Sequence, residues 1–173
     1  MRVVCFYTEL APAAEAALAA FAPDAELVHT PADDIWAMGR ELRARWTGED
    51  DLVVIEGDKE IHAGVLPSFT ACGRDWCSFG SLTSGPGTRY TNIGLGCARF
   101  AASVQRAVTA AALQTRDNPA WPLCHLCGGA GCWRYLDIRV ATVLFRRAYI
   151  LHDHGEIAHH HPRLKILEPG GQR

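Results

Sequence analysis

Apolar and polar positions follow two alternating periodicities along the first third of the chain. Residues 2–7 and 26–30 are short, β-prone apolar runs, which predict strands. Residues 11–21 are alanine-rich, and residues 31–46 carry apolar positions at helical spacing, so both segments are predicted helices. Strands that alternate with helices form parallel sheets through right-handed crossovers. The pattern therefore predicts an α/β fold of three layers with a mostly parallel central sheet.

A short, unbroken apolar run extends from Leu52 to Ile55 and is rich in β-branched residues. Such a run is typical of a strand that is covered on both faces. Two acids, Glu56 and Asp58, follow it directly, with Gly57 between them. Ligands of open α/β sheets bind beyond the carboxyl ends of the strands, and we expect these acids to lie there.

The spacing of Glu56 and Asp58 indicates a metal site. In an extended chain their side chains point the same way, about 6.6–7 Å apart at the backbone, and their charges repel. A hard divalent cation between them removes this repulsion. Mg²⁺ typically takes one or two protein carboxylates and fills its other positions with water and phosphate oxygens. The alternative is a polar turn in which both acids are solvated.

The middle of the chain has a less regular pattern. Residues 61–71 are predicted to form a short helix, and residues 72–79 lead into another strand. Residues 80–96 are glycine-rich, which favours a functional loop and candidate lid. Residues 97–113 have apolar positions at intervals of four and are predicted as a helix.

The last third supplies further candidate ligands. A helix is predicted over residues 133–147, with Asp137 in its first turns, and a last strand over residues 148–151. A histidine cluster follows, in which His159 and His161 share a face if the segment is extended. Either histidine is a candidate to complete a metal shell begun at the acids, with Mn²⁺ better suited than Mg²⁺ and with Zn²⁺ or Fe²⁺ as alternatives. A solvated histidine-rich turn is the competing interpretation.

A cysteine motif offers a second candidate metal site. Cys124 and Cys127 form a C-x-x-C pair, and Cys132 follows after a run rich in glycine. This pattern is typical of half of a structural zinc site. His125, or the C-x₄-C pair of Cys72 and Cys77, is among the candidates for the missing ligands. Free or packed thiols are the alternative.

Composition limits the classes of function. The 173 residues are most simply one domain, 49% hydrophobic and 21% charged, with a formal net charge of −2. A slightly negative net charge does not favour sequence-independent binding to the phosphate backbone of nucleic acids. No apolar run approaches the roughly 20 residues that span a bilayer, and the first residues form a predicted strand rather than a signal peptide. We therefore expect a cytoplasmic protein, in which seven cysteines are thiols or metal ligands rather than a disulfide framework.

Three short segments carry a family resemblance. Residues 53–58, 94–100 and 133–137 resemble small glycosyltransferase-like proteins of the GT-A type from actinobacteria and their phages. The resemblance covers roughly residues 2–161. The first acid of the family's acid-x-acid motif is usually Asp, whereas this chain has Glu56.

The resemblance implies a domain organisation and an activity. Residues 1–58 would be a nucleotide-binding βαβαβ half, residues 59–161 the half that binds the acceptor and completes the metal site, and residues 162–173 a tail. The implied function is metal-dependent transfer of a sugar from a nucleoside-diphosphate sugar to an unknown acceptor. A modified DNA base is one candidate acceptor, but the net negative charge of the chain does not favour binding to DNA.

The resemblance also implies roles for individual residues. Asp58 and a late histidine would hold Mn²⁺ or Mg²⁺ as a Lewis acid on the departing phosphates, and Glu56 would assist. Tyr7 and Thr8 would face the nucleotide. In an inverting reaction, Asp137 would be the general base.

Two other functions compete with the transferase. One is an interaction or regulatory module that zinc stabilises at Cys124, Cys127 and Cys132. The other is a metal-dependent hydrolase that uses Asp58 and the C-terminal histidines.

Overall fold

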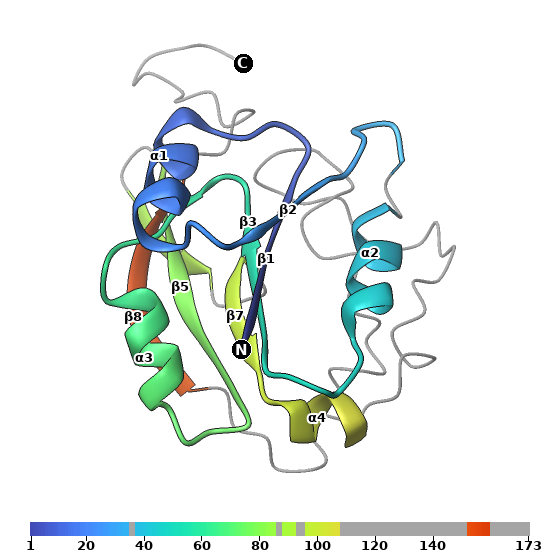
Figure 1. Cartoon of the computed structure of the whole chain (residues 1–173). Helices are drawn as coiled ribbons and strands as arrows, with labels where there is room; N and C mark the ends of the chain where they lie inside the picture. The colour runs from blue at the N-terminus through green and yellow to red at the C-terminus, as the bar shows by residue number, and fades with distance from the viewer. Residues whose placement is uncertain (35–36, 86–87, 93–95, 108–151, 160–173) are drawn as a thin grey trace, which may run out of the picture.

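A computed structural model describes most of the first two thirds of the chain and one late strand (Figure 1). The described residues are 1–34, 37–85, 88–92, 96–107 and 152–159. The predicted helix over residues 133–147, the predicted strand over residues 148–151 and the predicted tail all lie outside these ranges.

The first half folds as the periodicity predicts. Strands and helices alternate, and only the second helix is clearly shorter than predicted. The elements are β1 (Arg2–Tyr7), α1 (Pro12–Phe21), β2 (Glu26–His29), α2 (Ala37–Arg45) and β3 (Leu52–Glu56).

The second half departs from the prediction at several points. Its described elements are β4 (Lys59–Glu60), α3 (Val65–Ala71), β5 (Trp76–Gly85), β6 (Thr88–Asn92), β7 (Cys97–Phe100), α4 (Ala102–Ala107) and β8 (His152–His159). The predicted helix over residues 61–71 and the strand after residue 72 are confirmed.

The prediction of a glycine-rich lid over residues 80–96 is wrong for most of that span. β5 continues to Gly85, and β6 pairs with it in antiparallel register from Ser81↔Asn92 to Gly85↔Thr88. Glycine inside a strand often marks a bulge. Here the register of β5 against β8 shifts between Ser78 and Gly80. Among the described residues of this span, Gly80 and Gly85 therefore belong to an irregular strand rather than to a loop.

The predicted helix over residues 97–113 begins later than expected. Cys97–Phe100 is a fully buried strand, β7, and the helix α4 starts only at Ala102. β7 runs antiparallel to both β3 and β5 and lies between them. Its position inside the sheet, with neighbours on both sides, overrides the helical spacing of its apolar residues.

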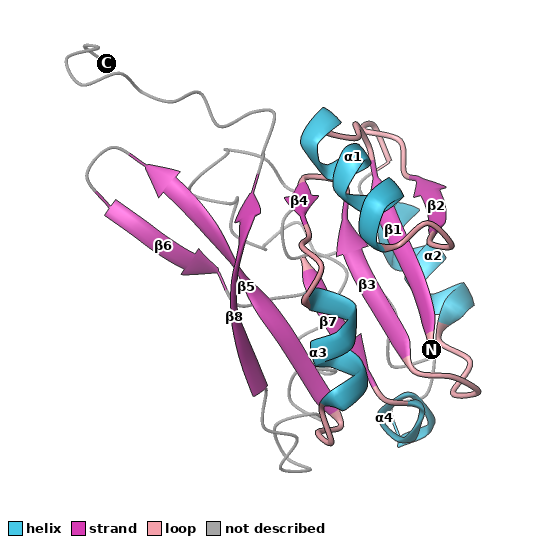
Figure 2. Cartoon of the chain, turned by 60° about the vertical axis from the view of Figure 1, so that its left-hand side comes forward, coloured by secondary structure: helices cyan, strands magenta, loops and turns pink. Residues whose placement is uncertain are grey.

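The sheet has the order β2-β1-β3-β7-β5-β8-β4, with β6 paired to β5 (Figure 2). β1 is parallel to β2 and β3, and β5 is parallel to β8. Because β7 is antiparallel to both β3 and β5, these five strands share one direction. β7, β6 and β4 run the opposite way. The predicted mostly parallel direction therefore holds, although β7 interrupts the parallel pairing.

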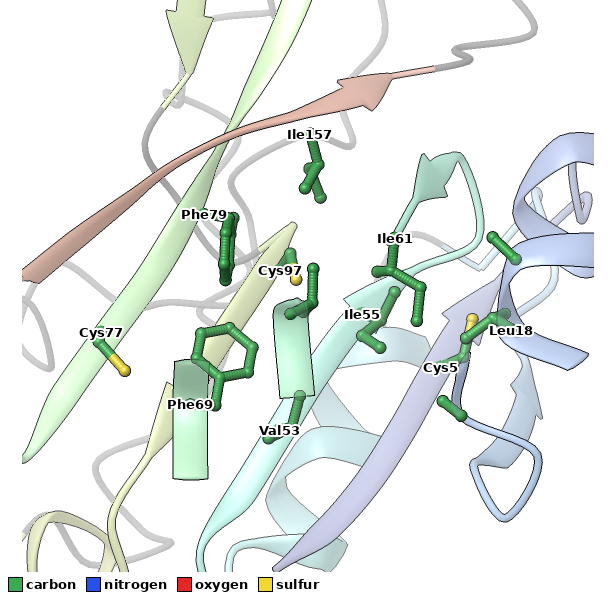
Figure 3. Close-up of a cluster of buried hydrophobic side chains, with 13 residues drawn as sticks. Cys5, Leu18, Val53, Ile55, Ile61, Phe69, Cys77, Phe79, Cys97 and Ile157 are labelled. Carbon is green, nitrogen blue, oxygen red and sulfur yellow. The ribbon is translucent and has the colours of Figure 1, made fainter. Parts of the chain in front are cut away.

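Helices cover both faces of the sheet, which gives the predicted three layers (Figure 1). Successive residues of β3 point to opposite faces. Leu52 and Val54 join the core under α2 and α4, whereas Val53 and Ile55 join the core under α1 and α3. Figure 3 shows the second core. No helix in the described ranges is long and apolar enough to cross a membrane.

A buried ion pair closes the amino end of the central strands. Arg99 of β7 donates to Asp51 Oδ2, at 2.9 Å from Nε, and to the carbonyl oxygens of Cys72 and Arg74. Asp51 Oδ1 accepts from the Ala102 N–H at 2.9 Å, at the start of α4. Arg99 therefore ties β7 and the loop before β5 to Asp51, and Asp51 ties the start of α4 to β3. Arg99 lies far from the carboxyl-end acids and is not available to contact a phosphate there.

Substituting Arg99→Met should lower the free energy of unfolding by about 2–3 kcal/mol, because Asp51 and two carbonyls lose a charged donor. Urea denaturation at neutral pH measures the effect. Arg40→Met is the control, since Arg40 forms an exposed pair with Asp34 and such pairs contribute little. Equal shifts of the urea midpoint in the two variants would contradict this role for Arg99.

The pH dependence of stability should report the same ion pair. Burial raises the pKa of Asp51, but the Ala102 N–H and the Arg99 guanidinium outweigh it, so this pKa lies below its usual 3.8. The contribution of Asp51 is therefore present above pH 3.8 and is lost as the pH falls through the depressed pKa. In urea titrations, the stability gap between wild type and Asp51→Asn should be constant near neutral pH and narrow below pH 3.8. A gap that does not change with acidification contradicts the assignment.

Candidate functional site

The carboxyl ends of β1 and β3 meet closely at Gly57. Its N–H donates to the Phe6 carbonyl at 2.8 Å, and its own carbonyl accepts from the Ala11 N–H at 3.0 Å. A Cβ atom at Gly57 would lie 2.4 Å from the Tyr7 Cβ, a separation that no side chain tolerates. Glycine is therefore required at the centre of the acid-x-acid motif by packing, and it brings the motif against the end of β1.

Tyr7 and Thr8 lie where the resemblance places the nucleotide, at the end of β1. The Thr30 N–H donates to the Tyr7 carbonyl at 2.7 Å, and the Thr8 and Thr30 hydroxyl oxygens are 3.5 Å apart. The Tyr7 ring meets the His29 ring edge to face, with centroids 5.4 Å apart. Two aromatic rings and two hydroxyl groups thus gather at the carboxyl ends of β1 and β2, and Tyr7 also adjoins Gly57 of the acid motif.

A buried lysine lies between the two acids. Lys59 Nζ is 3.0 Å from Glu56 Oε2 and 2.5 Å from Asp58 Oδ1. The lysine side chain is 3% exposed, whereas those of Glu56 and Asp58 are 23% and 15% exposed. The ammonium neutralises part of the repulsion between the carboxylates, which is the task that the sequence assigned to a cation. We call these three residues the ion triad.

Electrostatics keep the lysine of the triad charged. Burial lowers the pKa of Lys59, but the carboxylates of Glu56 and Asp58 outweigh it, so this pKa lies above its usual 10.5. Lys59 is therefore protonated across the physiological range. Two negative charges and one positive charge leave the triad with a net charge of −1.

The backbone around the triad makes room for Lys59. Gly96 precedes β7, and its carbonyl accepts from the Glu56 N–H at 2.8 Å. A Cβ atom at Gly96 would lie 2.5 Å from Lys59 Cε and 3.1 Å from Glu56 Oε2. The absence of a side chain at Gly96 therefore gives the lysine its path to the acids.

The backbone of His159 lies directly across from Lys59. β4 and β8 are antiparallel, with the register Lys59↔His159. Residues 152–159, where the sequence predicts a histidine cluster in either an extended segment or a solvated turn, form a strand. This register brings one predicted histidine ligand next to the triad along the backbone.

Several predicted site residues cannot be placed. Asp137, His161 and the cysteines of the zinc motif, Cys124, Cys127 and Cys132, lie outside the described residues. Within the described ranges, no group of three or more His, Cys, Asp and Glu side chains is arranged to hold a metal ion.

The donor set of the triad fits a cation that binds together with substrate. Two carboxylates are the hard oxygen ligands that Mg²⁺ and Mn²⁺ take when phosphate oxygens supply further ligands. Each carboxylate offers about four lone-pair positions, so one carboxylate can accept from Lys59 and have other partners as well. The arrangement does not fit a cation held midway between the acids, because the ammonium lies there.

Two buried cysteines lie on the strands that neighbour β3. Cys5 of β1 and Cys97 of β7 flank Ile55 of β3 in register, as Figure 3 shows. Burial raises the pKa of Cys5 to about 12, and the negative charges of Asp58 and Glu56 add to the rise. Burial also raises the pKa of Cys97. These thiols are therefore packing residues rather than nucleophiles.

Cys72 and Cys77, the C-x₄-C pair offered as further zinc ligands, are also free thiols. The pKa of Cys77 is raised to about 12, first by burial and then by a hydrogen bond with Cys72. A protonated, buried Cys77 is a poor metal ligand, since metals bind the thiolate.

Comparison with known proteins adds only a similarity of fold. No protein-family model matches the chain, and no curated protein matches its sequence. Among solved structures, the chain is similar to A197 from STIV, with 14% identity over 66% of this chain and 72% of that chain, and a TM-score of 0.47.

Two further solved structures carry transferase names. A glycosyltransferase involved in the glycosylation of the major capsid of PBCV-1 is 9% identical over 88% of this chain and 83% of that chain, with a TM-score of 0.43. A protein assigned as a glucose-1-phosphate thymidylyltransferase from Bacillus anthracis, in complex with a sucrose, is 13% identical over 76% of this chain, with a TM-score of 0.37. This chain spans only 55% of that protein. At such low identities and TM-scores, function has to be argued from the geometry of the chain itself.

Replacing Gly57 by alanine should destabilise the protein by about 1–3 kcal/mol, because the added methyl group forces the ends of β1 and β3 apart. Urea denaturation measures the loss. Gly73→Ala is the matched control, since a Cβ atom there meets nothing within 4 Å. If the two alanine variants are equally stable, the close approach of Gly57 to Tyr7 is not a constraint on the fold.

Proposed function

We propose that this protein transfers a sugar from a nucleoside-diphosphate sugar, with the donor bound at the carboxyl ends of β1 and β3. The convergence of the triad with Tyr7 and Thr8 at one edge of the sheet carries the proposal. Ligands of open α/β sheets bind at this edge. The acceptor is an unidentified hydroxyl compound.

The proposal assigns the two sides of the site to two parts of the donor. Tyr7 supplies a ring face and Thr8 a hydroxyl group for the nucleoside, beside the edge-to-face contact with His29. Asp58, with help from Glu56 and from His159 or His161, holds Mn²⁺ or Mg²⁺ against the diphosphate. When bound, this cation acts as a Lewis acid that stabilises charge on the departing phosphates.

Charge supports a role for a cation. Glu56, Asp58 and Lys59 together carry a charge of −1, and a diphosphate is also negative, so a cation bound at Asp58 would reduce the repulsion between them. Asp58 is the acid with the closer contact to Lys59 and the one that the resemblance makes the principal ligand. Asp137 stays the predicted general base for the acceptor.

Asp58→Asn should abolish stabilisation of the protein by a nucleoside diphosphate in the presence of Mn²⁺. In wild type, a ligand at one hundred times its Kd stabilises the fold by about 2.7 kcal/mol, which a melting experiment detects readily. The experiment compares Tm with Mn²⁺ and each of UDP, GDP, ADP, CDP and dTDP. Asp24→Asn is the matched control, because Asp24 is an exposed acid in the turn before β2, at the other end of the sheet.

The outcome separates the classes of function. A melting shift with one diphosphate that survives Asp24→Asn and is lost in Asp58→Asn supports the transferase. If no nucleoside diphosphate shifts the Tm of wild type, the proposal is wrong. The same set of samples, analysed for bound zinc before and after chelation, tests the alternative of a zinc-stabilised module.

A further inference from the structure

Two cysteine thiols meet where α3 ends and β5 begins. Cys72 directly follows α3, and Cys77 is the second residue of β5. Cys77 is fully buried in the core under α1 and α3 (Figure 3), and Cys72 packs against the same core while part of its surface stays exposed. The Cys77 thiol forms a hydrogen bond with the Cys72 side chain. One accessible thiol and one buried thiol are thus in contact.

Arg99 holds the two cysteines in place. Its backbone lies directly across from Cys77 in the pairing of β7 with β5. Its guanidinium donates to the Cys72 carbonyl at 3.2 Å and to the Arg74 carbonyl at 2.8 Å, and it also forms a hydrogen bond with the Cys77 side chain. One side chain therefore anchors the segment that links the two thiols, and the fold keeps them together.

The other two cysteines of the described residues have a different environment. Cys5 and Cys97 are fully buried, so an oxidant dissolved in water does not reach them directly. They lie on β1 and β7, and β3 separates these two strands. Cys72 is thus the one cysteine in the described ranges that combines exposure with a thiol in contact.

We infer that Cys72 and Cys77 form a redox-active dithiol, which closes to a disulfide when hydrogen peroxide reaches Cys72. The Cys72 thiolate attacks one peroxide oxygen, the O–O bond breaks, and the departing hydroxide takes up a proton to leave as water. Cys72 is now a sulfenic acid. The Cys77 sulfur attacks the Cys72 sulfur, the S–O bond breaks, and the hydroxide leaves as water with the proton of Cys77. Two thiols are oxidised to one disulfide, and one peroxide is reduced to two waters.

The environments of the two thiols set the order of these steps. Cys77 is buried and protonated, because burial and then the contact with Cys72 raise its pKa to about 12. Only a thiolate is a good nucleophile, so Cys72 is the thiol that reacts with peroxide. Oxidation of Cys72 removes the negative charge that contributes to the raised pKa of Cys77. The second step therefore becomes easier after the first.

Mass spectrometry of tryptic peptides tests the inference on the wild-type full chain. Trypsin cleaves after Arg74, between the two cysteines, so Cys72 falls in peptide 60–74 and Cys77 in peptide 75–89. Neither peptide contains another cysteine. After treatment with an equimolar amount of hydrogen peroxide and alkylation of the remaining thiols, the predominant disulfide should join these two peptides.

The same digest gives the results that overturn the inference. Peptide 75–89 joined to peptide 90–99 would show that Cys77 pairs with Cys97. Peptide 60–74 joined to peptide 117–134, which holds three cysteines, would show that Cys72 has another partner. Recovery of both peptides 60–74 and 75–89 in alkylated form would show that the dithiol does not close.

A variant of the buried thiol tests the order of the steps. Cys77→Ala should stop the reaction at the sulfenic acid of Cys72, so labelling of peptide 60–74 by dimedone should rise about tenfold over wild type. Cys5→Ala is the matched control, because it removes an equally buried thiol from the same core. It should form the disulfide to the same extent as wild type. If Cys77→Ala shows no more labelling than wild type, Cys72 is not the thiol that peroxide attacks.

A comparison of folded and unfolded protein separates the effect of the fold from that of sequence proximity. Wild type is equilibrated with reduced and oxidised glutathione, in native buffer and in urea that unfolds the chain. Because the fold holds the two thiols together, the ratio of disulfide to dithiol should be roughly tenfold higher in native buffer. An equal or lower ratio in native buffer overturns the inference.

Discussion

A buried ammonium between two carboxylates is the constraint on which the tip of the central strand depends. Lys59 holds Glu56 and Asp58 in one cluster, and the surrounding backbone is shaped to admit it. Gly57 lets β3 press against Tyr7, and Gly96 leaves space for the lysine stem. An isolated buried charge would be very costly, so a lysine at this depth requires both acids as partners. Local packing and the charge of the candidate site therefore have a single physical origin.

The two ends of the central strands use buried charge in different ways. At the amino end, two backbone carbonyls accept from Arg99 and a backbone N–H donates to Asp51. The pair is therefore fully hydrogen-bonded within the protein, which is typical of a structural role. At the carboxyl end, two carboxylates share one ammonium and remain partly exposed to solvent. This contrast favours the carboxyl end as the functional one.

Much of the fold could be predicted because its strands and helices have distinct periods. The run from Leu52 to Ile55 is buried on both faces, as its unbroken apolar pattern indicated. β7 could not be recognised, since its four residues include Arg99, which reads as a solvated position in the sequence. Arg99 is buried only because Asp51, 48 residues earlier, pairs with it. A buried charge whose partner lies far away in the chain leaves no signal in the sequence around it.

The structure brings some of the predicted site residues together, and it adds a charged residue that the sequence analysis did not single out. The acids after β3 and the residues after β1 do meet, as the rule for open sheets predicted. Lys59 was missed, because a lysine beside two acids has the same local sequence whether it is solvated or buried. The sole hint was its adjacency to the motif. Its backbone partner is β8, a strand that begins more than ninety residues later.

That separation has a consequence for how the protein is made. Lys59 leaves the ribosome 100 residues before His159, its partner across β4 and β8. At typical synthesis rates, this interval lasts about 5–20 s. During it the nascent chain can pair β1, β2 and β3, whereas β8, the strand partner of the short β4, has not yet been made. The strand tip that we assign to chemistry is thus among the last parts of the described fold to take its final shape.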